Sequence, residues 1–146
     1  MRALLQRVSS AAVSVGDRLV GEISHGFLLF VCVMRGDNES EAEWLARKVV
    51  NLRIFDDDLH RMNRSILDIG GDILVVSQFT LAAEIRGNRP SYSKAAAPQA
   101  ARQLCGHFSN ALADYGLRVA EGVFGADLQV CLVNDGPVTI WLDSTA

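Results

Sequence analysis

Two short strings place polar side chains and accessible backbone beside apolar stretches, and they are the parts of this sequence best suited to chemistry. The first is residues 77–81 (SQFTL), which bring three hydrogen-bonding side chains together. The second is residues 134–139 (NDGPVT), in which Gly136 offers bare backbone and Pro137 lacks the N–H that a strand would donate. Such groups can hold a small substrate closely without gripping its side chain. We therefore take both strings as the candidate site.

Strand geometry predicts which groups of the first string can meet a substrate. A strand over residues 73–81 would place Gln78 and Thr80 on one face, because strand side chains alternate. Ser77 and Phe79 would lie on the other face, where Ser77 would brace the backbone. Backbone N–H groups released at the strand end could stabilise an oxyanion. The same residues also fit an ordinary strand end with capping polar groups.

The second string also allows two interpretations. The dipeptide Asp135–Gly136 is a common hairpin signal, and Pro137 could simply end one strand. X–Pro bonds in folded proteins are cis in only about 5–6% of cases. Taken alone, these residues therefore predict a simple turn with a trans bond.

The surrounding elements predict one α+β domain over residues 1–146, a curved antiparallel-rich sheet or barrel with helices packed outside. A chain of this length that is 49% hydrophobic can bury a core of its own. Helices are expected after Asn38 or Ser40, each followed three residues later by glutamate, and between Pro98 and Gly116. The second helix should bury Ala101, Leu104, Phe108, Leu112 and Tyr115. Strands are expected at 2–15, 18–20, 27–34, 73–81, 128–132 and 138–142.

The histidines and cysteines lack the spacing of a metal site or a redox pair. We therefore expect no metal and no cofactor, and we expect the three thiols to be buried and free. The residues concerned are His25, His60, His107, Cys32, Cys105 and Cys131.

Hydropathy and charge limit the partners. No apolar run approaches the ~20 residues that span a bilayer, and the N-terminus turns polar too early for a signal peptide. We therefore expect a cytoplasmic protein without membrane contact. The net charge of −3 argues against a broad nucleic-acid face but leaves room for a small footprint on an RNA end. Three basic clusters could form that footprint or lie solvated on the surface: Arg47, Lys48 and Arg53; Arg61 and Arg64; and Arg86, Arg89 and Lys94.

The two strings, in this order and at this separation, closely resemble the D-aminoacyl-tRNA deacylase family. The resemblance extends over nearly the whole chain through residues 6–8 (QRV), 51–55 (NLRIF), 62–63 (MN) and 87–91 (GNRPS). One departure is residues 59–61 (LHR), where the family usually has Gly-Lys before Met-Asn. That difference falls in a turn, which could also be a place of RNA contact, and leaves both strings intact.

The resemblance implies an enzyme that hydrolyses the ester joining a D-amino acid to the 3′ end of tRNA, acting as a homodimer. Ser77, Gln78 and Thr80 match the family's SQxxT element, with the N–H of Phe79 at the reacting carbonyl. Thr80 could be a nucleophile, but no base lies near it in the sequence, so we favour a positioning role. The family mechanism that we adopt uses the ribose 2′-OH of the terminal adenosine to move the proton.

The second string corresponds to the family's Gly-Pro element. Gly136 and Pro137 match the element itself, whose bond is cis in the family and enters the partner subunit's pocket, and Arg7 matches the arginine that holds it. This rigid backbone would leave room for a D-side chain and collide with an L-side chain, which is chiral proofreading by sterics. Glycine has no Cβ to collide, so glycyl-tRNA should also be cleaved.

Two other functions fit the residues before the resemblance is considered. One is a non-catalytic protein that binds a small ligand or an RNA end. The other is a hydrolase of free D-amino-acid derivatives, which would need no RNA contact. Salt dependence of binding and a comparison of charged tRNA with a free ester separate these functions from a tRNA deacylase.

Overall fold

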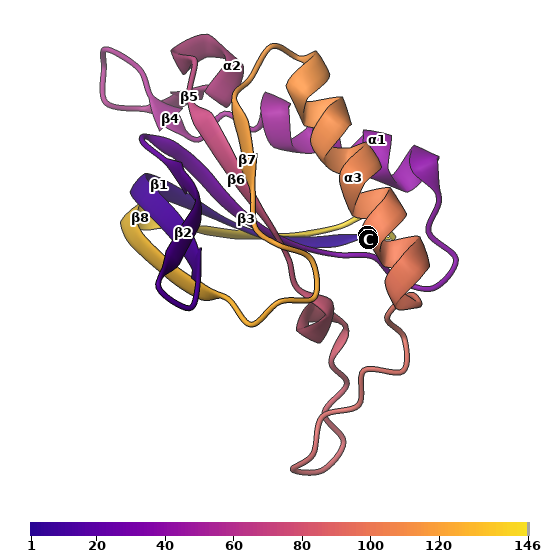
Figure 1. Ribbon diagram of the computed structural model, residues 1–146. Coiled ribbons are helices and arrows are strands. Elements are labelled where there is room, and N and C mark those ends of the chain that lie inside the picture. Colours follow the sequence, from indigo (N-terminus) through magenta and orange to yellow (C-terminus); the bar gives the residue numbers. More distant parts are fainter. Residues whose placement is uncertain (146) are drawn as a thin grey trace.

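A strongly curved, six-stranded mixed sheet forms the centre of the protein (Figure 1). The computed structural model describes residues 1–145. The strand order is β2-β1-β3-β6-β7, and β8 pairs with the other side of β1. These strands are β1 (Arg2–Val15), β2 (Arg18–Ile23), β3 (Gly26–Cys32), β6 (Asp72–Ser77), β7 (Val119–Glu121) and β8 (Gln129–Asp143). The single-domain α+β fold with a barrel-like sheet confirms the fold predicted from the sequence.

β1 is long enough to organise the whole sheet. Its first half pairs antiparallel with β3, its second half pairs antiparallel with β2, and β8 runs along nearly all of it. β3 and β6, and then β6 and β7, are parallel pairs. β3 and β6 are buried on both faces, which explains their nearly continuous apolar sequences.

Two hydrophobic clusters lie on opposite faces of this sheet. Leu5, Phe27 and Leu29 belong to the larger cluster, which the helices cover. Val8, Leu28 and Leu74 belong to the smaller cluster on the other face. The period of two along β3 and β6 therefore sends alternate side chains into different cores.

Helices α1 (Glu39–Asn51) and α3 (Pro98–Asp114) lie side by side over the larger cluster (Figure 1). The Asn38 side chain caps α1, and Glu41 completes a capping box, so the helix begins at the first of the two predicted caps. α3 buries Leu104, Phe108 and Leu112 as predicted, and Ala101 is partly buried. The prediction for Tyr115 was wrong: this residue is 44% exposed, because the helix ends there.

Three short elements occupy the polar region for which no element was predicted. They are β4 (Phe55–Asp56), β5 (Met62–Arg64) and α2 (Ile66–Ile69), where Ser65 caps the helix. Two to four residues are too few to produce a recognisable hydrophobic period.

The structure corrects both candidate strings. The strand expected over 73–81 ends at Ser77 and is followed by a 3₁₀ turn, η1 (Phe79–Ala82). The prediction of a simple turn at Asp135–Gly136 was wrong, because β8 continues through these residues and both of its halves pair with β1. The extra residues form a bulge between the pairs Gln6–Thr139 and Val8–Asn134. Across residues 1–145, no helix has the length and apolarity needed to cross a membrane.

Candidate active site

The first string forms a polar turn at the end of β6. The Gln78 N–H donates to the Val31 carbonyl at 2.7 Å, and this bond closes the β3–β6 ladder. The chain then turns into η1, whose first N–H groups, on Phe79 and Thr80, have no partner within the turn. Two donors thus become available where the strand stops.

Gln78 and Thr80 meet, although not through the alternation expected of a strand. The Gln78 side-chain N–H₂ donates to the Thr80 hydroxyl across the turn. The Phe79 ring, 59% exposed, stands against the ring of Tyr92 with centroids 5.1 Å apart and an edge-on angle of 79°. The turn therefore holds the amide of Gln78 in place and presents an aromatic face to solvent.

A cavity of about 1090 Å³ opens beside this turn. Ser77, Gln78 and Phe79 form one wall, whereas Thr80 lies outside the lining. The other walls come from residues 32–37 after β3, residues 95–98 before and at the start of α3, and the loop 123–128 before β8. Tyr92 also lines the cavity, and sequence reasoning missed it. The available signal was an aromatic residue in an otherwise small and polar loop.

Two cysteines flank the turn, and neither is poised as a nucleophile. Cys32 lines the cavity, and burial raises the pKa of its thiol. Burial also raises the pKa of the Cys105 thiol, to about 11, although its hydrogen bond with Ser77 acts in the opposite direction. Both thiols are therefore neutral near pH 7. The expectation of three buried thiols was wrong for Cys131, which lies on an exposed position of β8.

The second string forms the bulge of β8, and its Gly136–Pro137 bond is cis. The bond thus differs from the trans bond favoured by the residues alone and agrees with the expectation from the resemblance. The Asn134 side chain braces the bulge by donating to the carbonyls of Arg7 at 2.9 Å and Val138 at 3.1 Å. A Cβ on Gly136 would lie 2.6 Å from the Asn134 side-chain oxygen, so only glycine fits without a shift.

Arg7 reaches this bulge from β1. Its Nε donates to the Asp135 carbonyl at 3.0 Å, and an Nη donates to the Ile54 carbonyl at 2.5 Å. The Asp135 carboxylate lies 3.3 Å from the same Nε, and His25 lies 3.6 Å from that carboxylate. A buried guanidinium thus joins β1, the segment before β4 and the bulge.

Within one chain, the two strings do not meet. The register places Ser77 beside Val31, and Val31 beside Ala3. The bulge instead lies beside residues 6–8 of β1, about 14 Å further along the strand at ~3.4 Å per residue. No residue of the bulge lines the cavity, and Gly136 and Pro137 are exposed.

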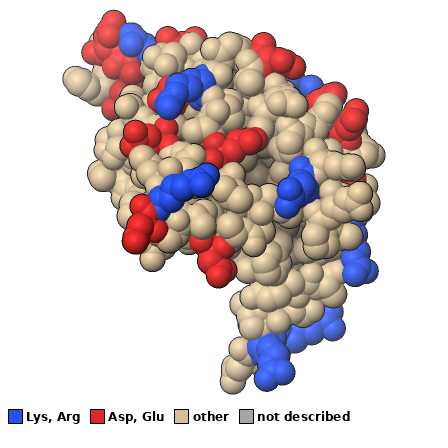
Figure 2. Space-filling model, in the orientation of Figure 1, with Lys and Arg blue, Asp and Glu red and all other residues tan. Residues whose placement is uncertain are grey.

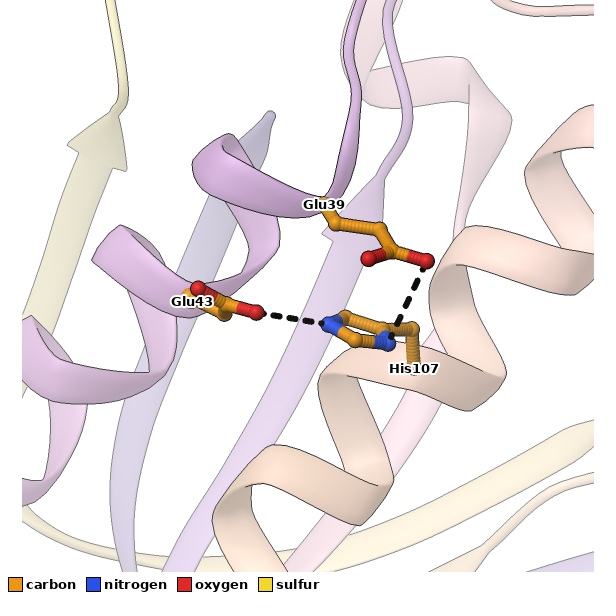
Figure 3. Close-up of side chains that lie close together, drawn as sticks. All are labelled: Glu39, Glu43 and His107. Carbon is orange, nitrogen blue, oxygen red and sulfur yellow. Dashed lines mark hydrogen bonds and ion pairs between the residues drawn. The ribbon is translucent and has the colours of Figure 1, made fainter.

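A separate polar cluster lies between α1 and α3, where side chains of the two helices face one another (Figure 3). Glu39, Glu43 and His107 each place one potential ligand atom within 4.8 Å of the others. The ring nitrogens of His107 face different carboxylates, at 3.2 Å from Glu43 and 3.9 Å from Glu39. A hydrogen bond between His107 and Glu43 joins the two helices here, and none of the three residues lines the large cavity.

Solved structures of known proteins share this fold. The structure titled c-Myc DNA Unwinding Element Binding Protein superimposes with a TM-score of 0.94 at 37% identity, and the match covers 100% of both chains. A probable eukaryotic D-amino acid tRNA deacylase superimposes with a TM-score of 0.86 at 16% identity over 97% of both chains, a likeness in fold alone. The protein thus has the same α+β fold as these two solved structures.

Sequence comparison identifies the family. The family model described as D-Tyr-tRNA(Tyr) deacylase matches residues 4–143, and the chain belongs to this family of enzymes. A D-aminoacyl-tRNA deacylase of Thermomicrobium roseum is 58% identical over 99% of this chain and 94% of the relative. One of Ruegeria sp. (strain TM1040) is 57% identical over 99% of this chain and 93% of the relative. The resemblance identified from the sequence is confirmed.

Proposed function

We propose that the protein hydrolyses the ester bond of D-aminoacyl-tRNA, releasing the D-amino acid and free tRNA in the cytoplasm, where tRNA is charged. The cavity beside Ser77, Gln78 and Phe79 is the observation that carries this proposal. It combines a polar turn, backbone donors and an apolar wall in a chain whose relatives bear the name of that activity. An aminoacyl ester is already activated, so positioning, an oxyanion donor and a water molecule suffice.

In this mechanism the Phe79 N–H stabilises the oxyanion that forms at the ester carbonyl. Water attacks the carbonyl carbon, the bond to the ribose 3′-oxygen breaks, and that oxygen takes the proton with the help of the neighbouring 2′-OH. Gln78 orients the substrate, and Thr80 positions Gln78 through their hydrogen bond. The neutral thiols of Cys32 and Cys105 support a route without a covalent thioester.

The working unit in this proposal is a homodimer. Gly136 and Pro137 of one subunit enter the cavity of the other, since the bulge is exposed and remote from its own cavity. Exposed apolar side chains on β8 support a protein contact on this side, with Val133 57% and Trp141 48% exposed. Light scattering of the purified protein tests the subunit count, and a monomer with full activity would contradict this part.

The wedge of Gly136 and Pro137 would then provide the chiral proofreading. Their carbonyls hold the substrate ammonium, the Phe79 N–H holds the carbonyl, and the hydrogen at Cα faces the wedge. A D-side chain points away, whereas an L-side chain would occupy the same space as main-chain atoms. A rigid backbone excludes the L-substrate more strongly than a side-chain pocket that selects by size, in which one methylene changes the discrimination by only about 1–3 kcal/mol. Glycyl-tRNA should also be cleaved, because glycine has no side chain that could collide with this backbone.

Deacylation of matched tyrosyl-tRNAs tests the proposal. D-tyrosyl-tRNA and glycyl-tRNA should lose their amino acid in proportion to enzyme, while L-tyrosyl-tRNA should not. Binding of the charged tRNA without hydrolysis would favour the non-catalytic alternative. Equal rates on D-tyrosyl-tRNA and on D-tyrosine ethyl ester would favour a hydrolase of free derivatives. Resistance of glycyl-tRNA alone would overturn the steric mechanism and leave the activity standing.

A further inference from the structure

A two-stranded arm extends from the body of the protein directly beside η1 (Figure 1). Its base is closed by reciprocal backbone hydrogen bonds of 2.8 and 2.9 Å between Glu84 and Ser91. A second bridge, between Met34 and Ala95, fixes the returning chain to the end of β3. The arm is thus anchored at both ends to the walls of the large cavity.

The arm carries excess positive charge. Residues 84–94 include Arg86, Arg89 and Lys94 against a single acid, Glu84. Glu84 pairs with Lys94 and lies 3.5 Å from Arg86, whose side chain is 90% exposed. Among residues 1–145, Arg89 takes part in no ion pair. Figure 2 shows blue atoms without red neighbours at the tip of the arm, whereas red and blue atoms are mixed over the body.

The other two basic clusters differ from the arm in position and in charge. Arg61 and Arg64 lie by the β4–β5 hairpin, at the opposite end of the molecule (Figure 1), and residues 56–58 of the same hairpin are three aspartates. Arg64 is paired with Asp58 at 2.9 Å. Arg47 lines a separate hollow between α1 and α3. Of the three basic clusters predicted from the sequence, only the one on the arm is connected to the cavity wall. The connection is Tyr92, which lines the cavity and contacts Phe79.

We propose that residues 84–94 bind the phosphate backbone of the tRNA acceptor stem, with Arg86 and Arg89 as the contacts. This inference rests on the proposed function, because it places the ester in the cavity beside η1. A few unpaired nucleotides separate that ester from the first base pair of tRNA, so the stem must leave the cavity close to its rim. Arginine suits phosphate through its planar, multiply donating guanidinium, and such contacts require no base sequence. The arm would therefore supply affinity for tRNA in general.

The test compares a long and a short substrate. D-tyrosyl-tRNA presents the stem, whereas D-tyrosyl-adenosine, the terminal nucleoside carrying the same ester, lacks it. For the double variant Arg86→Gln/Arg89→Gln we expect kcat/KM on D-tyrosyl-tRNA to fall about tenfold through KM. The slope of log kcat/KM against log salt should become shallower by about 1–2 units. Cleavage of D-tyrosyl-adenosine should stay within about twofold of wild type.

A matched control removes two arginines from the other end of the molecule. Arg61→Gln/Arg64→Gln should leave KM and the salt slope at their wild-type values. The inference is overturned if both double variants behave alike, if the arm variant loses activity equally on both substrates, or if it dissociates into monomers by light scattering. Failure of wild-type enzyme to cleave either substrate would instead refute the proposed function. The two failures are thereby distinguished.

Discussion

Arg7 and Asp135, which are far apart in the sequence, are joined side chain to main chain: the Arg7 guanidinium donates to the Asp135 carbonyl at 3.0 Å. The same guanidinium donates to Ile54, so one buried cation connects three segments. Asp135 immediately precedes Gly136 and Pro137. The position of the proposed chiral wedge therefore depends on a side chain from the first strand.

Replacing Arg7 should loosen the bulge. In Arg7→Lys a point charge replaces the planar guanidinium, so either the buried carbonyl of Ile54 or the partly buried carbonyl of Asp135 loses its hydrogen-bond donor. We expect a loss of about 1–3 kcal/mol in the free energy of unfolding, and a lower D/L activity ratio. Gln6→Ala is the control, since Gln6 also reaches β8, through Thr139, but in an exposed position. Denaturant unfolding measures the free energy of unfolding, and deacylation assays measure the D/L activity ratio. Equal effects of the two substitutions would contradict this role of Arg7.

Gly136→Ala should displace the wedge itself. Its Cβ would lie 2.6 Å from the Asn134 side-chain oxygen, and Asn134 holds the bulge to β1. We expect unfolding to become easier by about 1–3 kcal/mol and the discrimination against L-tyrosyl-tRNA to fall about tenfold or more.

Gly106→Ala provides the matched control for that substitution. Gly106 lies within α3, and an added Cβ there meets nothing within 4 Å. Alanine should stabilise the helix by about 0.5–1 kcal/mol and leave the D/L ratio unchanged. A Gly136→Ala enzyme with the D/L activity ratio of wild type would show that the bulge does not discriminate between D- and L-aminoacyl-tRNA.

Thr80 should act by positioning Gln78. Thr80→Ala removes the hydroxyl that accepts a hydrogen bond from the Gln78 amide. We therefore expect kcat on D-tyrosyl-tRNA to fall about 10- to 100-fold, with measurable activity left. Thr80→Ser keeps the hydroxyl and should restore most of the rate. Quenched reactions analysed by mass spectrometry should contain no acyl-enzyme. Complete inactivity of Thr80→Ala, together with an acyl group on wild-type Thr80, would assign it as the nucleophile.

The buried thiol of Cys105 should make stability fall at alkaline pH. Its pKa is about 11 in the folded protein against 9.0 for an ordinary cysteine, so the unfolded chain releases this proton first. Below pH 9 the protonated thiol contributes about 2–3 kcal/mol to the free energy of unfolding, and this contribution is lost as the pH rises towards 11. Unfolding free energies measured on both sides of pH 9 should therefore converge for wild type and Cys105→Ala as the pH rises. A constant difference between the two proteins would refute the shift.

Local signals in the sequence predicted most of the elements. Alternation along residues 2–15 predicted β1, and the capping pattern after Asn38 predicted α1, because each depends on neighbours within a few residues. The two strings were also recognisable locally, through polar groups and Gly-Pro placed where apolar strand residues were expected. The short elements between residues 55 and 69 gave no comparable signal.

Tertiary pairing decided how each string is built. β6 stops at Ser77 because the ladder with β3 ends at Val31, and a chain without a partner can turn into η1. The second string became a bulge because β1, with 14 residues, pairs with both halves of β8. No feature of residues 134–139 themselves reveals how long the neighbouring strand is.

The sequence by itself determined which residues could do chemistry, which segments form strands and helices, and to which family the chain belongs. Only the tertiary structure decided that the two strings lie apart within one chain, and that the arm carrying Arg86 and Arg89, rather than the other basic clusters, joins the cavity wall through Tyr92. The physical reason is range. Side-chain periodicity and capping act over a few residues, whereas strand register brings together groups that are distant in the sequence.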